Sequence, residues 1–110
     1  METTRQQKIS RLLQKELSTI FLGVAHNFQG ILISTTKVHV SPDLSVARVY
    51  LSIVPSERGE EMLQLINEKS VSIRHDLAGR TRFQLRTVPE LTFYIDDSLD
   101  YMEHIDNLLK

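Results

Sequence analysis

The stretch SVSIRHDLAGRTRFQLRTVPELTFYI, residues 70–95, decides the fold expected for this chain. It opens with the pattern of an amphipathic helix and passes a glycine, Gly79. Its last residues alternate strictly between apolar and polar side chains, as a half-buried strand does. The apolar positions of that strand are Leu91, Phe93 and Ile95. We therefore expect the fold to be built around a helix followed by a core strand.

The same stretch carries the densest run of cationic side chains in the protein. These side chains stand between the start of the helix and the apolar end of the strand, and they are Arg74, His75, Arg80, Arg82 and Arg86. Asp76 is the one acid among them. We expect this cluster to carry the function.

Length and composition are those of a small globular protein. The 110 residues, with a hydrophobic fraction of 41% and a charged fraction of 25%, indicate a single domain spanning residues 1–110 with a modest core. Cysteine is absent, so disulfides and thiol chemistry are excluded. The chain shows no signal peptide and no apolar run that approaches the roughly 20 residues of a membrane span. A cytoplasmic protein without membrane contact is expected.

The net charge of −1 hides a strongly polarised distribution. Residues 3–15 hold only basic charges, Arg5, Lys8, Arg11 and Lys15. Residues 88–110 are mainly acidic, with Lys110 as the only lysine or arginine. A general nucleic-acid binder is usually basic overall, so the net charge argues mildly against that class of protein. The uneven distribution of the charges bears on which partners the protein binds, not on its fold.

The first half of the chain predicts a helix followed by a β-hairpin. The helix begins near Thr3 or Thr4 with capping-box spacing, and Gly23 is its expected end. Residues 23–34 are then an irregular segment. Residues 35–54 alternate as two strands joined by a turn at residues 41–45. Lys37 would lie on the strand face away from the aliphatic residues.

The second half predicts a second helix, a third strand and a last helix. Ser56 is the expected cap of the second helix. The apolar seam of that helix is interrupted at Ser70, where we expect a bend. An unbroken helix would set the third strand parallel to the second, and a sharp break could set it parallel to the first. The third strand should begin around Phe83 or Leu85, with Pro89 at an edge, a bulge or before the paired part. The last helix would run over residues 97–109.

Two segments resemble the bacterial ribosome-binding factor A family. They are SPDLSVARVYLSIV, residues 41–54, and VPELTFYIDDSLDYMEHIDNLL, residues 88–109, and QQKISRLLQKELSTIF is in the expected place at residues 6–21. The resemblance implies an α+β, KH-like domain (type II, αββαβ). Its three-stranded sheet would pack on helices, with a kinked second helix and a C-terminal helix. The family kink occurs at an Ala-x-Gly, and its position here is Lys69-Ser70-Val71.

The resemblance also implies a function. Family members are non-enzymatic assembly factors that bind the free 30S subunit and its 16S rRNA in late small-subunit maturation. That role includes rRNA 5′-end processing and a link to cold adaptation. A GTPase releases them, and a monomer without cofactor is expected. The expected RNA-binding residues are Lys69, Ser70, Arg74, His75, Arg80, Arg82, Arg86 and Lys37, with secondary contacts from Arg5 and Lys8.

Other interpretations of the same residues stay open. The acidic last helix could instead contact a protein partner, with the arginines as an ordinary solvated face and no RNA contact. Asp96 and Asp97 could form the carboxylate pair of a small hydrolase, although helix capping explains Asp97 more simply. The histidines His26, His39, His75 and His104 show no metal-ligand spacing. No metal site is therefore expected.

Overall fold

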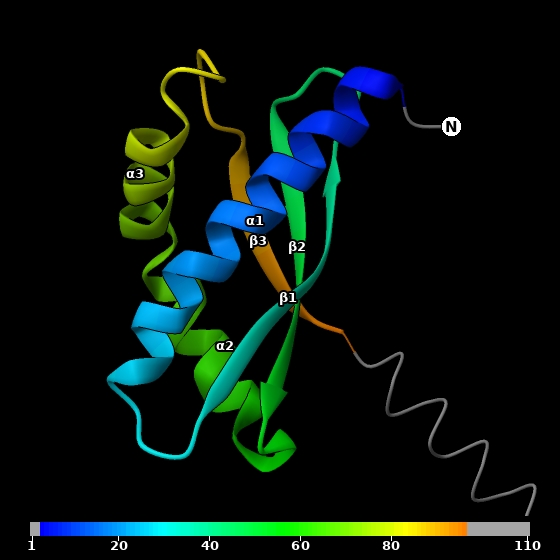
Figure 1. The fold of residues 1–110 in the computed structure, drawn as a ribbon. Coiled ribbons are helices and arrows are strands. Elements are labelled where there is room, and N and C mark those ends of the chain that lie inside the picture. Colours follow the sequence, from blue (N-terminus) through cyan, green and yellow to red (C-terminus); the bar gives the residue numbers. More distant parts are fainter. Residues whose placement is uncertain (1–2, 97–110) are drawn as a thin grey trace, which may run out of the picture.

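The computed structural model describes residues 3–96. Its elements, in chain order, are α1 (Thr4–His26), β1 (Leu32–Val40), β2 (Val46–Val54), the short 3-10 helix η1 (Ser56–Arg58), α2 (Gly59–Glu68), α3 (Ser70–Thr81) and β3 (Glu90–Ile95). The strands form one sheet in the order β1-β2-β3, in which β2 pairs antiparallel to β1 and parallel to β3 (Figure 1). The α+β class is confirmed. The helix expected over residues 97–109 lies outside the described residues.

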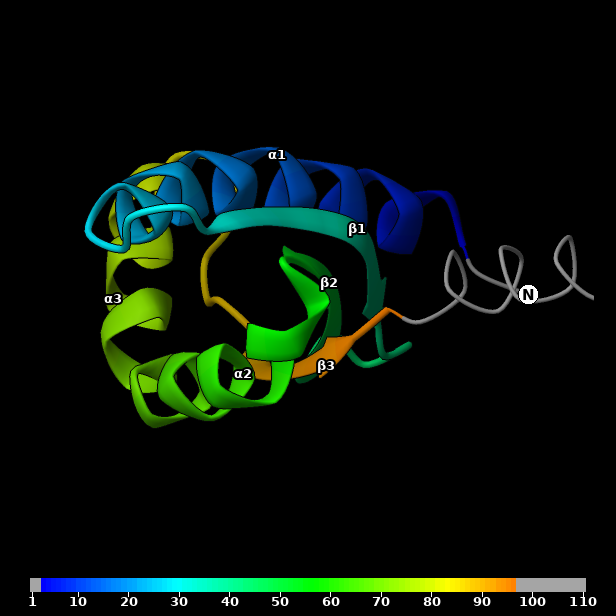
Figure 2. The ribbon, with the colours of Figure 1, turned by 90° about the horizontal axis from the view of Figure 1, so that it is seen from below.

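The three helices and the curved sheet surround a single hydrophobic core. Helix α1 crosses the sheet along β1, α2 packs beside β3, and α3 closes the side between them (Figure 2). Phe21 of α1 meets Phe93 of β3 edge to face at the centre, with ring centroids 5.7 Å apart and both side chains buried. The predicted alternation of β3 is confirmed, because Leu91 and Phe93 are buried and Ile95 packs against the core.

Helix α1 begins as predicted and ends later than predicted. Thr3 is its N-cap, and the Thr3–Gln6 capping box is formed. The side-chain amide of Gln6 also donates from Nε2 to the Val40 carbonyl at 3.0 Å, which joins the helix to the end of β1. The expected end at Gly23 is wrong, since the helix continues to His26. The buried side chain of Ala25 explains the extra turn, because tertiary packing outweighs the low helix propensity of glycine.

Replacing Gly23 by alanine should stabilise the protein by about 0.5–1 kcal/mol, because alanine loses less backbone entropy in a helix than glycine. No atom lies within 4 Å of the position that the added Cβ would take. Gly30→Ala is the matched control: Gly30 has φ +78°, and alanine there should cost about 1–2 kcal/mol. Urea unfolding of the two variants measures both changes. Two shifts of the same sign would contradict this account.

The hairpin is confirmed, with one feature that alternation did not reveal. β1 begins at Leu32, and its register with β2 shifts between Thr35 and Lys37, which is a β-bulge at Thr36. The bulge turns both Thr35 and Val38 toward the core. The side-chain amide of Gln14 on α1 donates to the carbonyls of Thr35 and Thr36 at 3.2 and 3.4 Å. Helix α1 is therefore tied to β1 by hydrogen bonds at the bulge.

The predicted break near Ser70 is confirmed. α2 ends at Glu68, Lys69 leaves helical geometry with φ −96° and ψ 10°, and α3 begins at Ser70. The break does not reverse the chain, because β3 still runs parallel to β2.

The expected cap at Ser56 is wrong: η1 has no side-chain cap, and α2 begins only at Gly59.

The third strand begins at Glu90, so the predicted start at Phe83 or Leu85 is wrong. Residues 82–89 form a loop, and Pro89 stands directly before the paired part of β3, one of the places predicted for it. The Phe83 side chain is 84% exposed, which does not fit a core strand. At the strand itself, the Asn67 amide on α2 pairs with both the N–H and the carbonyl of Phe93 at 3.3 Å. These bonds cover part of the outer edge of β3.

Candidate nucleic-acid interface

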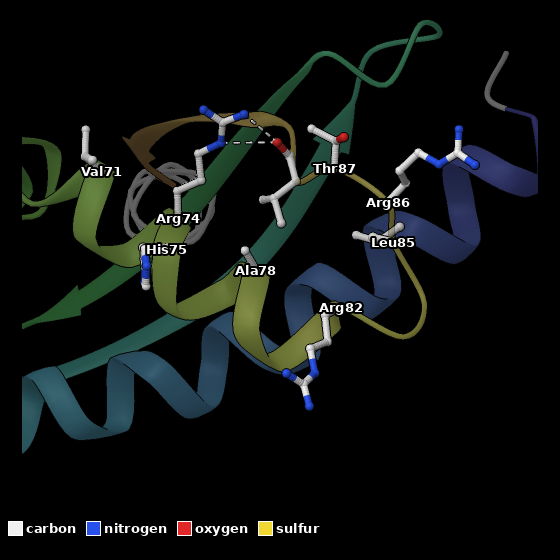
Figure 3. Close-up of a pocket in the computed structure, with 9 residues that line it drawn as sticks. Val71, Arg74, His75, Ala78, Arg82, Leu85, Arg86 and Thr87 are labelled. Atoms are coloured by element: carbon white, nitrogen blue, oxygen red, sulfur yellow. Dashed lines mark hydrogen bonds between the residues drawn. The ribbon is translucent and has the colours of Figure 1, made fainter.

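Two hollows meet at the loop formed by residues 82–89. The first, which we call the α3 hollow, has a volume of about 540 Å³ and lies between α3 and this loop (Figure 3). Its charged or ionisable lining residues are Arg74, His75, Arg82 and Arg86. No acidic residue is among the described residues that line it. The structure therefore brings four of the predicted RNA-binding residues to one place.

The spacing of α3 explains this arrangement. Ile73, Leu77 and Thr81, spaced by four residues, are buried against the core. Residues that follow each of them by one position also lie four apart and so share a neighbouring stripe on the helix surface. Those residues are Arg74, Ala78 and Arg82, and all three line the α3 hollow. The small side chain of Ala78 leaves the space between the two arginines open.

Arg74 holds the far wall of the α3 hollow in place. Its guanidinium donates from Nε and Nη2 to the Val88 carbonyl, at 3.1 and 2.7 Å (Figure 3). Val88 is buried, and Pro89 after it introduces β3. Arg74 therefore connects α3 to the residues that start the third strand.

Arg74→Gln should destabilise the protein by about 1–2 kcal/mol, because it removes two charge-assisted hydrogen bonds from a partly buried carbonyl. Arg82→Gln on the same helix face is the matched control and should change stability by less than about 0.5 kcal/mol. Urea unfolding of both variants checks the difference. Equal stability of the two variants would show that the Val88 contact contributes nothing.

The second hollow, the turn hollow, also measures about 540 Å³. It lies between the start of α1, the β1–β2 turn and the same loop, and its charged lining residues are Arg5, Lys8, Asp43 and Arg86. Hydrogen bonds from the Ser41 and Ser45 hydroxyls, 2.7 Å each, lower the pKa of Asp43 to about 2. The carboxylate is therefore anionic at neutral pH, and the turn hollow is less favourable to phosphate than the α3 hollow.

Four of the predicted RNA-binding residues lie away from both hollows. Arg80 pairs with Asp76 at 3.3 Å and with Glu16 of α1 at 3.9 Å. Lys69 and Arg80 line a third hollow of about 330 Å³ between α1 and α3. Ser70 is half-buried at the helix break, and exposed Lys37 lies opposite Tyr50 in the sheet. The predicted cluster is thus divided among separate surfaces.

Phe83 is an exposed aromatic residue in contact with Arg82, and sequence reasoning missed it. The guanidinium carbon of Arg82 lies 4.7 Å from the centroid of the Phe83 ring. The alternating residues FQLR at 83–86 look like the start of a strand, which hid this aromatic side chain among expected core positions. The sequence did contain a signal for this contact, because Phe83 directly follows Arg82 and an arginine can pack over a neighbouring aromatic ring.

Of the two carboxylates considered for a hydrolase, the structure describes Asp96, and Asp97 lies outside the described residues. Asp96 accepts a hydrogen bond from the Thr36 hydroxyl at 2.5 Å, so its carboxylate has a structural partner at the bulge. Among residues 3–96, no group of three or more His, Asp or Glu side chains could hold a metal ion. No helix in this part of the chain is long and apolar enough to cross a membrane.

The comparisons with known proteins agree with one another. The family model described as "Ribosome-binding factor A" matches residues 5–109. Proteins with that name from Flavobacterium psychrophilum and Chlorobaculum tepidum are 51% and 38% identical to this chain. The alignments cover 99% and 96% of this chain, and 85% and 88% of those proteins.

Solved structures give the same answer for the fold. The crystal structure of ribosome-binding factor A from Thermus thermophilus superposes with a TM-score of 0.68 at 22% identity, covering 82% of this chain and 94% of that one. Coordinates of the Thermus protein fitted into a cryo-EM map of a 30S–RbfA complex give 0.61 at 22% identity, covering 88% and 97%. The KH-like fold is confirmed.

Proposed function

This chain belongs to the ribosome-binding factor A family, and on that premise we propose that it binds the 30S ribosomal subunit by contacting 16S rRNA. The α3 hollow and its three arginines form the main contact. Arg5 and Lys8 form a secondary contact through the turn hollow, which shares Arg86 with the α3 hollow. Lys69, Ser70 and Lys37 lie outside this footprint, and Arg80 mainly stabilises the α1–α3 packing.

The α3 hollow is the observation that carries this proposal. Three guanidinium groups and an imidazole line an open concavity whose described lining contains no acid. Phosphate charge dominates the affinity of proteins for nucleic acids, and arginine adds forked hydrogen bonds and stacking. The surface of a folded RNA fits such a concavity better than it would fit a flat protein face.

The net charge of −1 places a limit on non-specific binding. A protein without excess positive charge gains little from the diffuse field of free RNA. Its affinity therefore depends on the shape and local charge of one site. We expect weak binding to free RNA and stronger binding to the assembled subunit.

Several finer features belong to the same proposal. The protein acts late in small-subunit maturation, at the stage of 16S rRNA 5′-end processing, and matters most in the cold. It works in the cytoplasm as a monomeric single domain spanning residues 1–110, performs no catalysis and is released by a ribosome-assembly GTPase. The family resemblance supports these features.

Co-sedimentation tests the proposal. The purified protein is mixed with free small subunits, free large subunits or joined ribosomes, at low and moderate salt, and centrifuged. We expect it to pellet with free small subunits, and less so as salt rises. Failure to pellet with any particle would overturn the proposal and favour a protein-interaction role.

A further inference from the structure

The two most exposed large hydrophobic side chains among residues 3–96 are Val71, which lines the α3 hollow, and Phe83, which follows a residue that lines it. Phe83 is 84% exposed and Val71 is 80% exposed. Val71 lines the hollow near the start of α3, and Phe83 follows Arg82 at its other end. Single exposed apolar residues are common on protein surfaces. Two of them beside a hollow lined by three arginines are a more specific arrangement.

The Phe83 ring is already engaged on one side. The Arg82 guanidinium stands 4.7 Å from the ring centroid, the distance of a cation–π contact. The side chain remains 84% exposed despite this contact, so the opposite face of the ring is open to solvent. Arg82 also lines the hollow. The contact therefore holds the ring against an arginine that lines the hollow.

We propose that Phe83 is a stacking platform for one unpaired base of an RNA strand whose phosphates occupy the α3 hollow. The inference rests on the proposed function and adds a preference for single-stranded over fully paired RNA. Sequence-tolerant binding of single strands combines cationic grooves for the backbone with aromatic rings for the bases. The α3 hollow and Phe83 supply one of each.

Charge decides between a base and other apolar ligands. A hydrophobic peptide or a protein surface would have to cover Arg74, Arg82 and Arg86 without a described acidic partner in the hollow. A nucleotide brings a phosphate for those groups and a flat π-system for the ring. The Arg82–Phe83 pair then continues as a stack of guanidinium, ring and base.

A tryptophan at position 83 reports stacking directly. The chain contains no tryptophan, so Phe83→Trp introduces a single fluorophore that retains an aromatic face. We expect its emission to be quenched when the full chain is titrated with 30S subunits or with a single-stranded RNA oligonucleotide. The same oligonucleotide annealed to its complement should quench much less. Leu22→Trp, at an exposed position on α1 that lines neither hollow, is the matched control and should not respond.

Affinity provides the second measurement. Phe83→Leu keeps an apolar side chain without the ring and should weaken 30S binding roughly tenfold, which corresponds to about 1.4 kcal/mol. Phe83→Tyr should retain nearly full affinity. The co-sedimentation assay with purified 30S subunits compares the affinities of both variants with that of the wild-type protein.

The outcomes separate the inference from the proposed function. If the wild-type protein binds 30S subunits but Phe83→Leu binds equally well, or Phe83→Trp is not quenched at saturation, only the stacking inference is overturned. Quenching by 30S subunits without quenching by saturating single-stranded RNA would assign Phe83 to a ribosomal-protein contact instead. If the wild-type protein does not bind 30S subunits, both the inference and the proposed function are wrong.

Discussion

Replacing Arg82 and Arg86 by glutamine should lower the affinity for 30S subunits about 10- to 100-fold, with the fold intact. The slope of log affinity against log salt concentration should become shallower by about two, one unit for each lost phosphate contact. Both guanidiniums line the α3 hollow, and Arg86 lines the turn hollow as well. Neither side chain has a carboxylate partner among the ion pairs of residues 3–96.

The choice of these two arginines follows from the contacts of the others. Arg74 holds the Val88 carbonyl and Arg80 is paired with Glu16 and Asp76, so their loss would disturb the fold and the interface together. Arg58→Gln is the matched control, because Arg58 lines neither hollow and pairs with Glu61. Co-sedimentation at several salt concentrations measures all variants. Unchanged affinity and slope in a folded double variant would exclude the α3 hollow as the RNA contact.

Phe93→Ala should destabilise the protein by about 3–5 kcal/mol, the usual cost of removing a fully buried ring. Phe93 is 1% exposed and meets Phe21 edge to face, so its loss opens a cavity between β3 and α1. The cost is a large share of the roughly 5–15 kcal/mol that stabilises a typical domain. Part of the population could therefore unfold near physiological temperature.

Phe83→Ala is the matched control for that substitution. The same side chain is removed from an 84% exposed position, so the free energy of unfolding should change by less than about 0.5 kcal/mol. Urea unfolding followed by circular dichroism compares the two variants. Similar costs at positions 83 and 93 would mean that Phe83 packs against the protein and is not free to stack on a ligand.

Local patterns predicted most of the fold. Strict alternation identified the hairpin and β3, the Thr3–Gln6 spacing identified the start of α1, and the polar interruption at Ser70 identified the helix break. The errors came from places where tertiary contacts decide. The alternation at residues 83–86 imitates a strand, yet no strand pairs with it. Gly23 imitates a helix end, yet the packing of Ala25 continues the helix.

Part of the site was also predictable from local sequence patterns. The four-residue spacing of Arg74, Ala78 and Arg82 follows from the helix alone. The same spacing places Arg80 on a different face of the helix from Ala78 and Arg82. Its pairing with Glu16, by contrast, depends on a helix more than sixty residues earlier in the sequence. The meeting of Arg86 with Arg5 and Lys8 likewise depends on how the loop passes the start of α1. Such contacts are set by the tertiary fold and leave no local signature.

Arg86 lines both hollows, and this sharing makes the two hollows interdependent. Two separate small anions, one in each hollow, would share the single positive charge of Arg86 and repel each other across it, so they would bind with negative cooperativity. A continuous strand meets less of this penalty, because its phosphates are already held near one another by the covalent backbone. The shared arginine thus discriminates in favour of a polymer over isolated nucleotides or free phosphate.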